Sequence, residues 1–303
     1  MHIYLPIAGQ SVNALFMILL GFGVGVLSGM FGIGGGFLTT PLLIFYGIPP
    51  TVAVASATTQ ITGASVSGAM VHMRRGGVDI KMAAVMTVGG FLGSVVGAAV
   101  FRMLQSTGQI DVVISSLYVL ILGWIGTIML KDALLALDIV PAKAARKAPP
   151  RHNRWVASLP LRWRFYSSGL YLSPVAPLAI GFAAGVMTVL LGIGGGFIIV
   201  PAMIYLLGMP ARVVIGTSLA MVLSVSAATT MVHALTTRSV DIVLAGLLLV
   251  GGVIGAQYGA LLALRTKPDL LRLALAVIIL LVGLRMLLGL AWRPDEIFSI
   301  EYL

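Results

Sequence analysis

The chain contains the hexapeptide Gly32-Ile33-Gly34-Gly35-Gly36-Phe37 inside a long apolar run, and it repeats that hexapeptide as Gly192-Ile193-Gly194-Gly195-Gly196-Phe197. Further matches follow in the same order, at spacings that range only from 160 (192 minus 32) to 162 (241 minus 79). They pair Pro41 with Pro201, Gly47 with Gly208, Pro49 with Pro210, His72 with His233, Asp79 with Asp241, and Gly89-Gly90 with Gly251-Gly252. One unit has therefore been duplicated, so each feature of the first copy can be checked against the second.

The composition is that of a membrane protein. Hydrophobic residues make up 59% of the 303 residues and charged residues only 9%, far from the proportions of a soluble domain. Apolar runs of about 20 residues, enough to cross roughly 30 Å of hydrocarbon, recur along the chain. Because helices satisfy their own backbone hydrogen bonds in lipid, we predict an all-α polytopic membrane protein with the lipid bilayer as its surroundings.

The charge pattern fits the same class. The net charge is +10, but the basic residues lie mainly between apolar segments, where they retain loops on the cytoplasmic side. We therefore expect no nucleic-acid partner, since no aromatic residues alternate with basic ones on a groove. The absence of cysteine excludes disulfides, thiolate catalysis and cysteine-based metal sites.

Each copy contains about five hydrophobic segments. In the first copy they are Val12 to Phe31 (with Ser11 to Met30 expected as a retained first helix), Phe37 to Tyr46, Thr51 to Met73, Ile80 to Phe101, and Asp111 to Leu130. The sequence thus predicts a first transmembrane repeat over 1–130, a basic linker over 131–171, and a second transmembrane repeat over 172–303. The linker carries eight Lys or Arg, so we expect it in the cytoplasm.

Two schemes are possible for the number of membrane crossings, one with ten and one with eight. If all five segments of each copy cross, the two repeats are inverted; if the short segment enters and returns, four cross and the repeats are parallel. Counting Lys and Arg on each side does not separate the two schemes. We favour inverted repeats, because an odd unit presents its two glycine loops from opposite faces toward one central site.

The glycine loops are predicted binding elements. Their bare peptide groups need a partner at membrane depth, and N–H groups at the start of a helix suit an anion. The alternative is that the glycines only let helices cross closely. Recurrence of the loop between a full span and a shortened one favours the binding interpretation. The residues concerned are Gly34, Gly35, Gly36, Gly194, Gly195 and Gly196.

Small polar residues follow near the start of the next helix in each copy. At 1.5 Å per residue they reach about 9 Å into the bilayer. Any one of them could be a packing or back-bonding group, but as a cluster they are suitable neutral donors for an oxyanion. They are Ser56, Thr58, Thr59 and Gln60 in the first copy and Thr217 and Ser218 in the second.

Other chemistry is weakly represented. All nine acidic residues fall in loops, at helix starts or near the tail, so an intramembrane cation path is not expected. His72 and His233 come late in their helices, where a capping or snorkelling role competes with proton coupling. We expect no catalytic residue, metal site or cofactor, because no general base or ligand cluster lies at depth.

With these motifs in this order, twice, the chain resembles the sulfite exporter TauE/SafE family, also described as the sulfonate uptake permease family. The resemblance extends from about Ala14 to Leu290. It implies a secondary transporter of a prokaryotic plasma membrane that moves small sulfur-containing anions (sulfite, sulfoacetate or other sulfonates), frequently outward. A homodimer is one assembly open to it. An anion channel or a scaffold without a coupled cycle is the alternative.

Overall fold

The computed structural model describes residues 2–31, 34–74, 76–136, 162–263 and 268–291. The chain forms two compact units. The larger unit comprises Met1–Ile110 with Lys143–Thr266, and the smaller comprises Asp111–Ala142 with Lys267–Leu303. Residues 137–161 of the predicted linker and the first two residues of the first hexapeptide lie outside the described residues.

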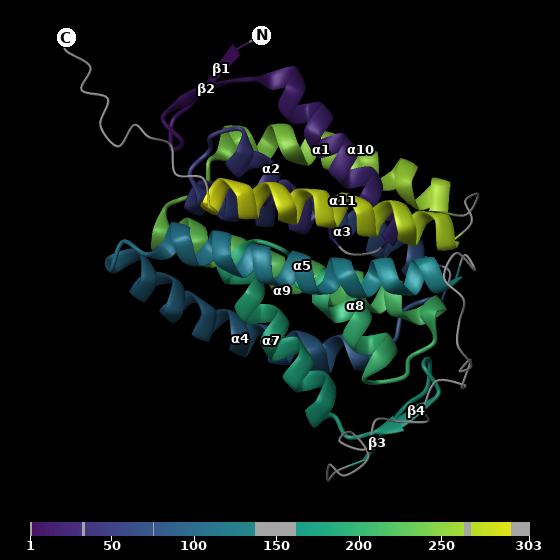
Figure 1. Ribbon diagram of the computed structural model, residues 1–303. Coiled ribbons are helices and arrows are strands. Elements are labelled where there is room, and N and C mark those ends of the chain that lie inside the picture. The colour runs from purple at the N-terminus through teal and green to yellow at the C-terminus, as the bar shows by residue number, and fades with distance from the viewer. Residues whose placement is uncertain (1, 32–33, 75, 137–161, 264–267, 292–303) are drawn as a thin grey trace, which may run out of the picture. The chain divides into compact units, whose positions relative to one another are not determined.

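The predicted helices are present in both copies (Figure 1). Their order within each copy is a long helix, a ten-residue helix and three more long helices, as the sequence predicts. In the first copy they are α1 (Ala14–Phe31), α2 (Gly36–Phe45), α3 (Pro50–Arg74), α4 (Ile80–Ser106) and α5 (Ile110–Ala136). In the second they are α7 (Val175–Leu191), α8 (Gly196–Tyr205), α9 (Ala211–Val232), which continues into the π-helical turn η1 (His233–Thr237), α10 (Ile242–Ala263) and α11 (Pro268–Ala291).

Six of the described helices are long and apolar enough to cross a membrane. They are Ala14–Phe31, Ile80–Ser106, Ile110–Leu135, Val213–Thr237, Ile242–Gly259 and Leu273–Ala291. The short helices α2 and α8 each contain a proline at their sixth residue, which removes one backbone hydrogen bond and limits their length. The prediction of an all-α, multi-pass membrane protein is confirmed.

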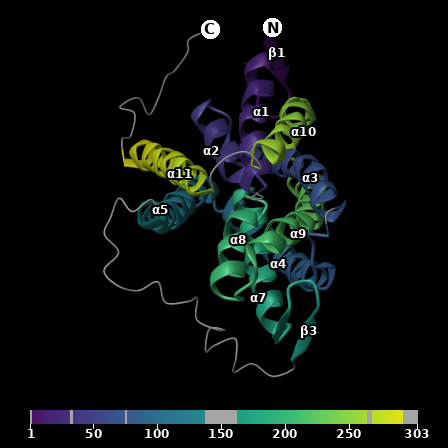
Figure 2. The same cartoon turned by 90° about the vertical axis from the view of Figure 1, so that its right-hand side faces the viewer.

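Two small β-hairpins were not predicted. Strand β1 (His2–Leu5) pairs with β2 (Gln10–Asn13), and β3 (Trp163–Phe165) pairs with β4 (Leu170–Leu172), both antiparallel. Each hairpin directly precedes the first helix of its copy, so α1 begins at Ala14 rather than at Ser11. Figures 1 and 2 place the two hairpins at opposite ends of the larger unit.

The two copies interlace in the larger unit, because the first helix of each copy packs along the fourth helix of the other. Helix α1 lies along α10, and α7 lies along α4. Two rows of glycines spaced four residues apart form these contacts: a Cβ at Gly89, Gly93 or Gly97 would meet the backbone of α7, and one at Gly251, Gly255 or Gly259 would meet that of α1. The rows therefore let the helices approach to backbone contact.

The equivalent helices that touch run in opposite directions. In the larger unit, Thr58 of α3 lies beside Thr230 of α9, and Gly68 lies against Leu219. As residue numbers rise along α3, the numbers of its neighbours on α9 fall. Within the smaller unit, Gly126 of α5 lies against Leu280 of α11 in the same way.

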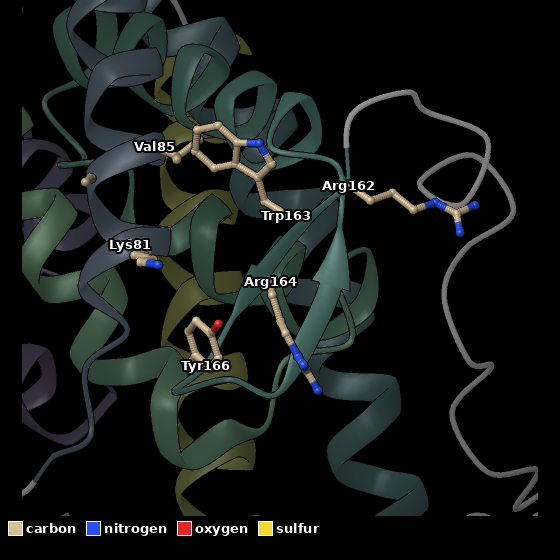
Figure 3. Close-up of a pocket in the computed structure, with 7 residues that line it drawn as sticks. Lys81, Val85, Arg162, Trp163, Arg164 and Tyr166 are labelled. Carbon is tan, nitrogen blue, oxygen red and sulfur yellow. The ribbon is translucent and has the colours of Figure 1, made fainter.

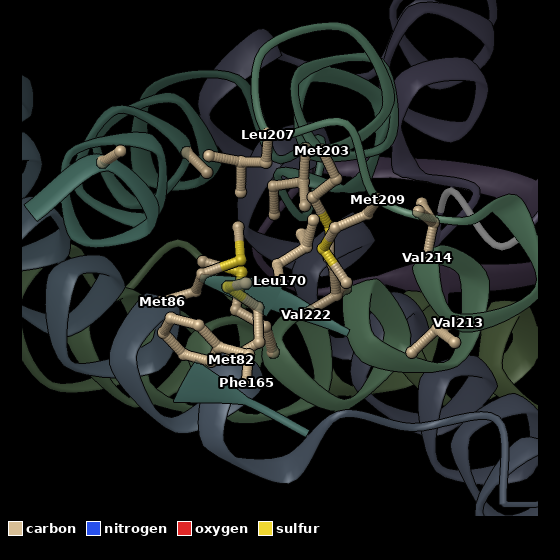
Figure 4. Close-up of a cluster of buried hydrophobic side chains, with 14 of the residues drawn as sticks. Met82, Met86, Phe165, Leu170, Met203, Leu207, Met209, Val213, Val214 and Val222 are labelled. Carbon is tan, nitrogen blue, oxygen red and sulfur yellow. The ribbon is translucent and has the colours of Figure 1, made fainter. Parts of the chain in front are cut away.

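Each hairpin packs on a hydrophobic core of its own, and each core contains residues of both copies. The first-hairpin core contains Leu5, Val12, Met17, Leu43, Ile48, Val52, Ala53, Leu244 and Leu248. The second-hairpin core includes Phe165 and Leu170 of the hairpin, Met82 and Met86 of α4, and residues of α7, α8 and α9 (Figure 4). In both cores the fourth helix comes from the opposite copy, which makes the larger unit a single interdependent body.

Candidate functional site

The two glycine loops lie together in the larger unit. A Cβ at Gly34 would lie 3.1 Å from Val222 and 3.2 Å from Ile61, and a Cβ at Gly194 would contact the same two side chains. Just beyond the loops, the rings of Phe37 and Phe197 stack with centroids 4.8 Å apart. The structure therefore brings the two loops together on one pair of matched side chains, Ile61 of α3 and Val222 of α9.

The backbone of each loop explains the glycines. Gly34 and Gly35 have φ values of 86° and 74°, and Gly194 and Gly195 have values of 72° and 73°. Residues with a Cβ rarely adopt these left-handed conformations. Gly35 and Gly195 are also the N-cap residues of α2 and α8, and neither cap has a side-chain hydrogen bond. Each loop thus presents peptide groups, not side chains, at the start of a helix.

The loop amides differ between the copies. In the second copy, the amides of Gly194, Gly195, Gly196 and Phe197 donate to no acceptor within the part of the chain that the structure describes. In the first copy, the amide of Gly36 donates to the carbonyl of Gly34 at 3.0 Å. The second loop therefore has the larger set of N–H groups available to a ligand at the positive end of a helix dipole.

Two of the predicted hydroxyls accept hydrogen bonds from backbone amides at helix starts of the opposite copy. Ser56 accepts a hydrogen bond from the amide of Asp241 at 3.3 Å, and Thr217 accepts one from the amide of Asp79 at 2.9 Å. These residues are equivalent in the two copies (217 minus 56 is 161) and both are fully buried. Each hydroxyl still has its own proton, which it could donate to a ligand.

The remaining predicted hydroxyls donate to their own helices. Thr58 and Thr59 donate to the carbonyl of Ala55 at 2.7 Å and 3.4 Å, and Ser218 donates to that of Ile215 at 2.9 Å. Thr58 also accepts a hydrogen bond from Thr230 of α9 at 3.3 Å. Back-bonding of this kind was the alternative role considered for single hydroxyls, and rotation about one torsion angle would be needed to redirect them to a ligand.

Gln60 links three helices. Its Oε1 accepts a hydrogen bond from Thr39 of α2 at 2.7 Å, and its Nε2 donates to the carbonyl of Gly21 in α1 at 3.4 Å. The equivalent position in the second copy is Met221, and that of Thr39 is Ile199, so this connection exists only in the first copy. Gln60 positions α2 and its glycine loop against α1.

Two buried hydroxyls without a partner were not among the predicted site residues. Thr40 and Ser65 are fully buried, and neither side-chain oxygen has a hydrogen-bond partner among the described residues. A Cβ at Gly192 would lie 3.1 Å from the Thr40 hydroxyl, and Ser65 follows Ile61 by one turn of α3. An unsatisfied buried hydroxyl is costly, so both oxygens are available to a ligand. The sequence signal was a Thr-Thr pair in an otherwise apolar short helix.

The two histidines have different surroundings. His233 is fully buried: Nε2 lies 3.1 Å from the carbonyl oxygen of Val189, Nδ1 lies 3.3 Å from the Thr237 hydroxyl, and the ring meets the face of Phe101 edge-on. His72 is only partly buried, near the end of α3. Because its ring is enclosed by protein, His233 does not snorkel; capping and proton coupling, the other roles considered for both histidines, stay predictions.

A family model described as sulfite exporter TauE/SafE matches residues 17–286. The chain belongs to the TauE/SafE family. The resemblance inferred from the duplicated motifs is therefore confirmed, and this TauE/SafE protein is a membrane transporter. No solved structure matches it.

Its relatives include proteins named as probable membrane transporters. The chain is 31% identical over 271 residues to the probable membrane transporter protein YjnA of Bacillus subtilis, covering 89% of this chain and 98% of the relative. It is 29% identical to a probable membrane transporter protein of Xylella fastidiosa (strain Temecula1), covering 91% and 92%. A shorter match, 31% identical over 107 residues (35% of this chain, 24% of the relative), is to sulfite exporter TauE/SafE family protein 1 of Arabidopsis thaliana.

Proposed function

We propose that this TauE/SafE protein is a secondary transporter that exports sulfite or another small sulfur-containing oxyanion across a prokaryotic plasma membrane. The observation that carries the proposal is the meeting of the two glycine loops on Ile61 and Val222. Two helix starts, one from each copy, then offer peptide N–H groups to one small anion. The description of the family model and the name of the Arabidopsis relative suggest sulfite as the first substrate to try.

The surroundings of the loops favour a neutral-donor site. The two buried carboxylates, Asp79 and Asp241, are turned to backbone amides and a serine at the hairpins, so they do not compete for the loop N–H groups. Thr40 and Ser65 add hydroxyl donors without a fixed charge. In an apolar interior such hydrogen bonds hold an oxyanion strongly, because little water competes for it.

We propose further that the repeats are inverted and that the site opens alternately to either side. The antiparallel passage of α3 and α9 supports this, since equivalent helices of inverted repeats run in opposite directions. The interlaced pairs α1 with α10 and α4 with α7 are the bodies whose rocking would expose the loops. In this scheme the segment 131–171 faces the cytoplasm, and a homodimer is the proposed assembly.

The decisive measurement is sulfite flux in proteoliposomes. Thr58→Val, which removes a buried hydroxyl one turn of α3 before Ile61, is expected to lower the flux while the protein elutes as a folded monodisperse species. Ser94→Ala is the matched control, because Ser94 is also a buried hydroxyl that donates to its own helix, at the carbonyl of Gly90. Unchanged flux in Thr58→Val, Ser65→Ala and Thr217→Val would remove these hydroxyls from the site.

The kinetics of the same assay separate a transporter from a channel. A coupled cycle predicts saturable flux and counterflow, in which unlabelled sulfite on one side drives uptake of labelled sulfite. Flux that rises linearly with concentration and shows no counterflow would favour the channel. In detergent, sulfite but not chloride at equal ionic strength is expected to raise the melting temperature.

A further inference from the structure

The hairpin that precedes the second copy carries a basic and aromatic hollow of about 490 Å³. It lies between the start of α4 and strand β3, within the larger unit (Figure 3). Its lining residues are Lys81, Ala84, Val85, Arg162, Trp163, Arg164 and Tyr166. Three of these are cationic, and none belongs to the glycine-loop site.

Two of the cations share one aromatic ring. The Nζ atom of Lys81 lies 5.1 Å from the ring centroid of Tyr166, and Cζ of Arg164 lies 6.0 Å from it. Neither cation forms an ion pair with an Asp or Glu of the described chain. The nearest acidic residue in sequence, Asp79, is buried and bonded to Ser168. Two cations on one ring, without an acidic partner among the described residues, leave positive charge at the hollow that an anion can neutralise.

The hollow lies at one end of a membrane span. Lys81 is the second residue of α4, which is one of the six helices able to cross a membrane. The hairpin beside it exposes Trp163, Tyr166 and Tyr171, which are 54%, 73% and 57% accessible. Exposed Trp and Tyr beside basic residues at the end of a span are typical of the depth at which lipid headgroups lie.

The first copy has the same hairpin without the charges. The positions equivalent to Trp163, Arg164 and Tyr166 are Ile3, Tyr4 and Pro6 (163 minus 3 is 160), and the position equivalent to Lys81 is Val243 (243 minus 81 is 162). Retention of positive charge on one side of the membrane explains the sign of this difference. Such charge retention does not explain why two of the cations contact the same aromatic ring in a hollow.

We propose that this hollow binds the phosphate group of an anionic phospholipid. Lys81 and Arg164 neutralise the phosphate, Tyr166 contacts both cations, and Trp163 contacts the glycerol and upper acyl region. The bound lipid would connect the hairpin to the start of α4. A soluble phosphate would satisfy the same cations, but the exposed aromatic residues at span-end depth favour the lipid.

The test is lipid-dependent stabilisation of the full-length protein in detergent. Phosphatidylglycerol is expected to raise the melting temperature of the wild type, whereas phosphatidylcholine at the same concentration is not. Arg164→Gln and Lys81→Gln should each weaken the apparent affinity for phosphatidylglycerol about fivefold, as expected for one cation at a membrane surface. Arg74→Gln is the charge-matched control, since Arg74 is an exposed cation at the last residue of α3, shortly before α4 begins at Ile80.

Two results would overturn the proposal. If Arg74→Gln weakens the response as much as Arg164→Gln, the effect is general surface charge rather than a site. If glycerol 3-phosphate or inorganic phosphate stabilises the wild type as well as phosphatidylglycerol does, the ligand is a soluble phosphate. Native mass spectrometry gives a readout that does not depend on stability: a phosphatidylglycerol adduct present in the wild type and Arg74→Gln should be lost in the Lys81→Gln/Arg164→Gln double variant.

Discussion

Asp79 of the first copy accepts two hydrogen bonds from Ser168 of the second, at 3.1 Å from the amide nitrogen and 2.7 Å from the hydroxyl. The other oxygen of the same carboxylate accepts from the amide of Met82 and so caps α4. The equivalent Asp241 accepts from the amides of Ile7 and Ala8 in the first hairpin and from that of Leu244 in α10. Each copy therefore fastens the hairpin of the other.

The hydrogen bonds between Asp79 and Ser168 predict that the stability losses of substitutions at these two residues are not additive. Ser168→Ala should destabilise the protein by about 1–3 kcal/mol, because it removes a hydrogen bond to a buried carboxylate. Asp79→Ala should cost more, since it also removes the helix cap, typically worth about 1 kcal/mol. Adding Ser168→Ala to Asp79→Ala should cost almost nothing further, and melting temperatures of the four proteins in detergent measure this coupling. Ser167→Ala, an exposed serine in the same turn, is the control, and additive losses would contradict the prediction.

The glycine rows predict sharply different effects for two alanine substitutions. A methyl group at Gly93 would overlap the carbonyl oxygen of Phe182, so Gly93→Ala should separate α4 from α7 and cost about 1–3 kcal/mol or more. Gly23 lies in α1 with nothing within 4 Å of an added Cβ. Gly23→Ala should be neutral or stabilising by up to about 1 kcal/mol, because alanine favours the helix. Equal melting temperatures for the two variants would show that close helix contact does not explain the row.

Ser65 allows ligand binding to be separated from folding. Its hydroxyl is buried and has no hydrogen-bond partner among the residues that the structure describes, so Ser65→Ala should leave the ligand-free melting temperature unchanged or raise it. If the hydroxyl contacts the anion, the same variant should reduce the stabilisation produced by sulfite. Ser226→Ala is the matched control, because the equivalent Ser226 already donates to the carbonyl of Val222. A full sulfite response in Ser65→Ala would place this hydroxyl outside the site.

The orientation of the repeats can be measured with single cysteines, since the chain has none of its own. Tyr4 and Tyr171 are exposed residues in the two equivalent hairpins, 64% and 57% accessible. Inverted repeats predict that an impermeant thiol reagent labels Tyr4→Cys in intact cells and labels Tyr171→Cys only after the membrane is opened. Labelling of both residues from the same side would support the parallel scheme.

The sequence was sufficient to predict the helices. Helix α3 begins at Pro50, one residue before the predicted Thr51, and α4 begins at the predicted Ile80, because start signals for helices are local. The hairpins were not predictable in the same way. Their strands have three or four residues, and Asp241, which binds the turn of the first hairpin, follows that turn by more than 230 residues. Long-range contacts of this kind leave no periodic signal in the sequence.

The sequence predicted that the two glycine loops lie together, but not the contacts of the hydroxyls around them, and ligand binding at the loops stays a prediction. Duplication of the loops indicated that Gly34 and Gly194 would share one location, and they contact the same two side chains. The individual roles of the hydroxyls depended on the fold. Ser56 and Thr217 could be assigned to the amides of Asp241 and Asp79 only once the interlacing of the copies was known.

That interlacing has a consequence for how the protein is made. Helix α1 ends at residue 31 and its neighbour α10 begins at residue 242, so α1 is inserted some two hundred residues before its partner is translated. Neither copy forms a complete hydrophobic core by itself. The first helices to be inserted must therefore stay in the lipid or beside the insertion machinery until their partners are made. A gene split between the copies should therefore yield a working carrier only when both fragments are produced in the same cell.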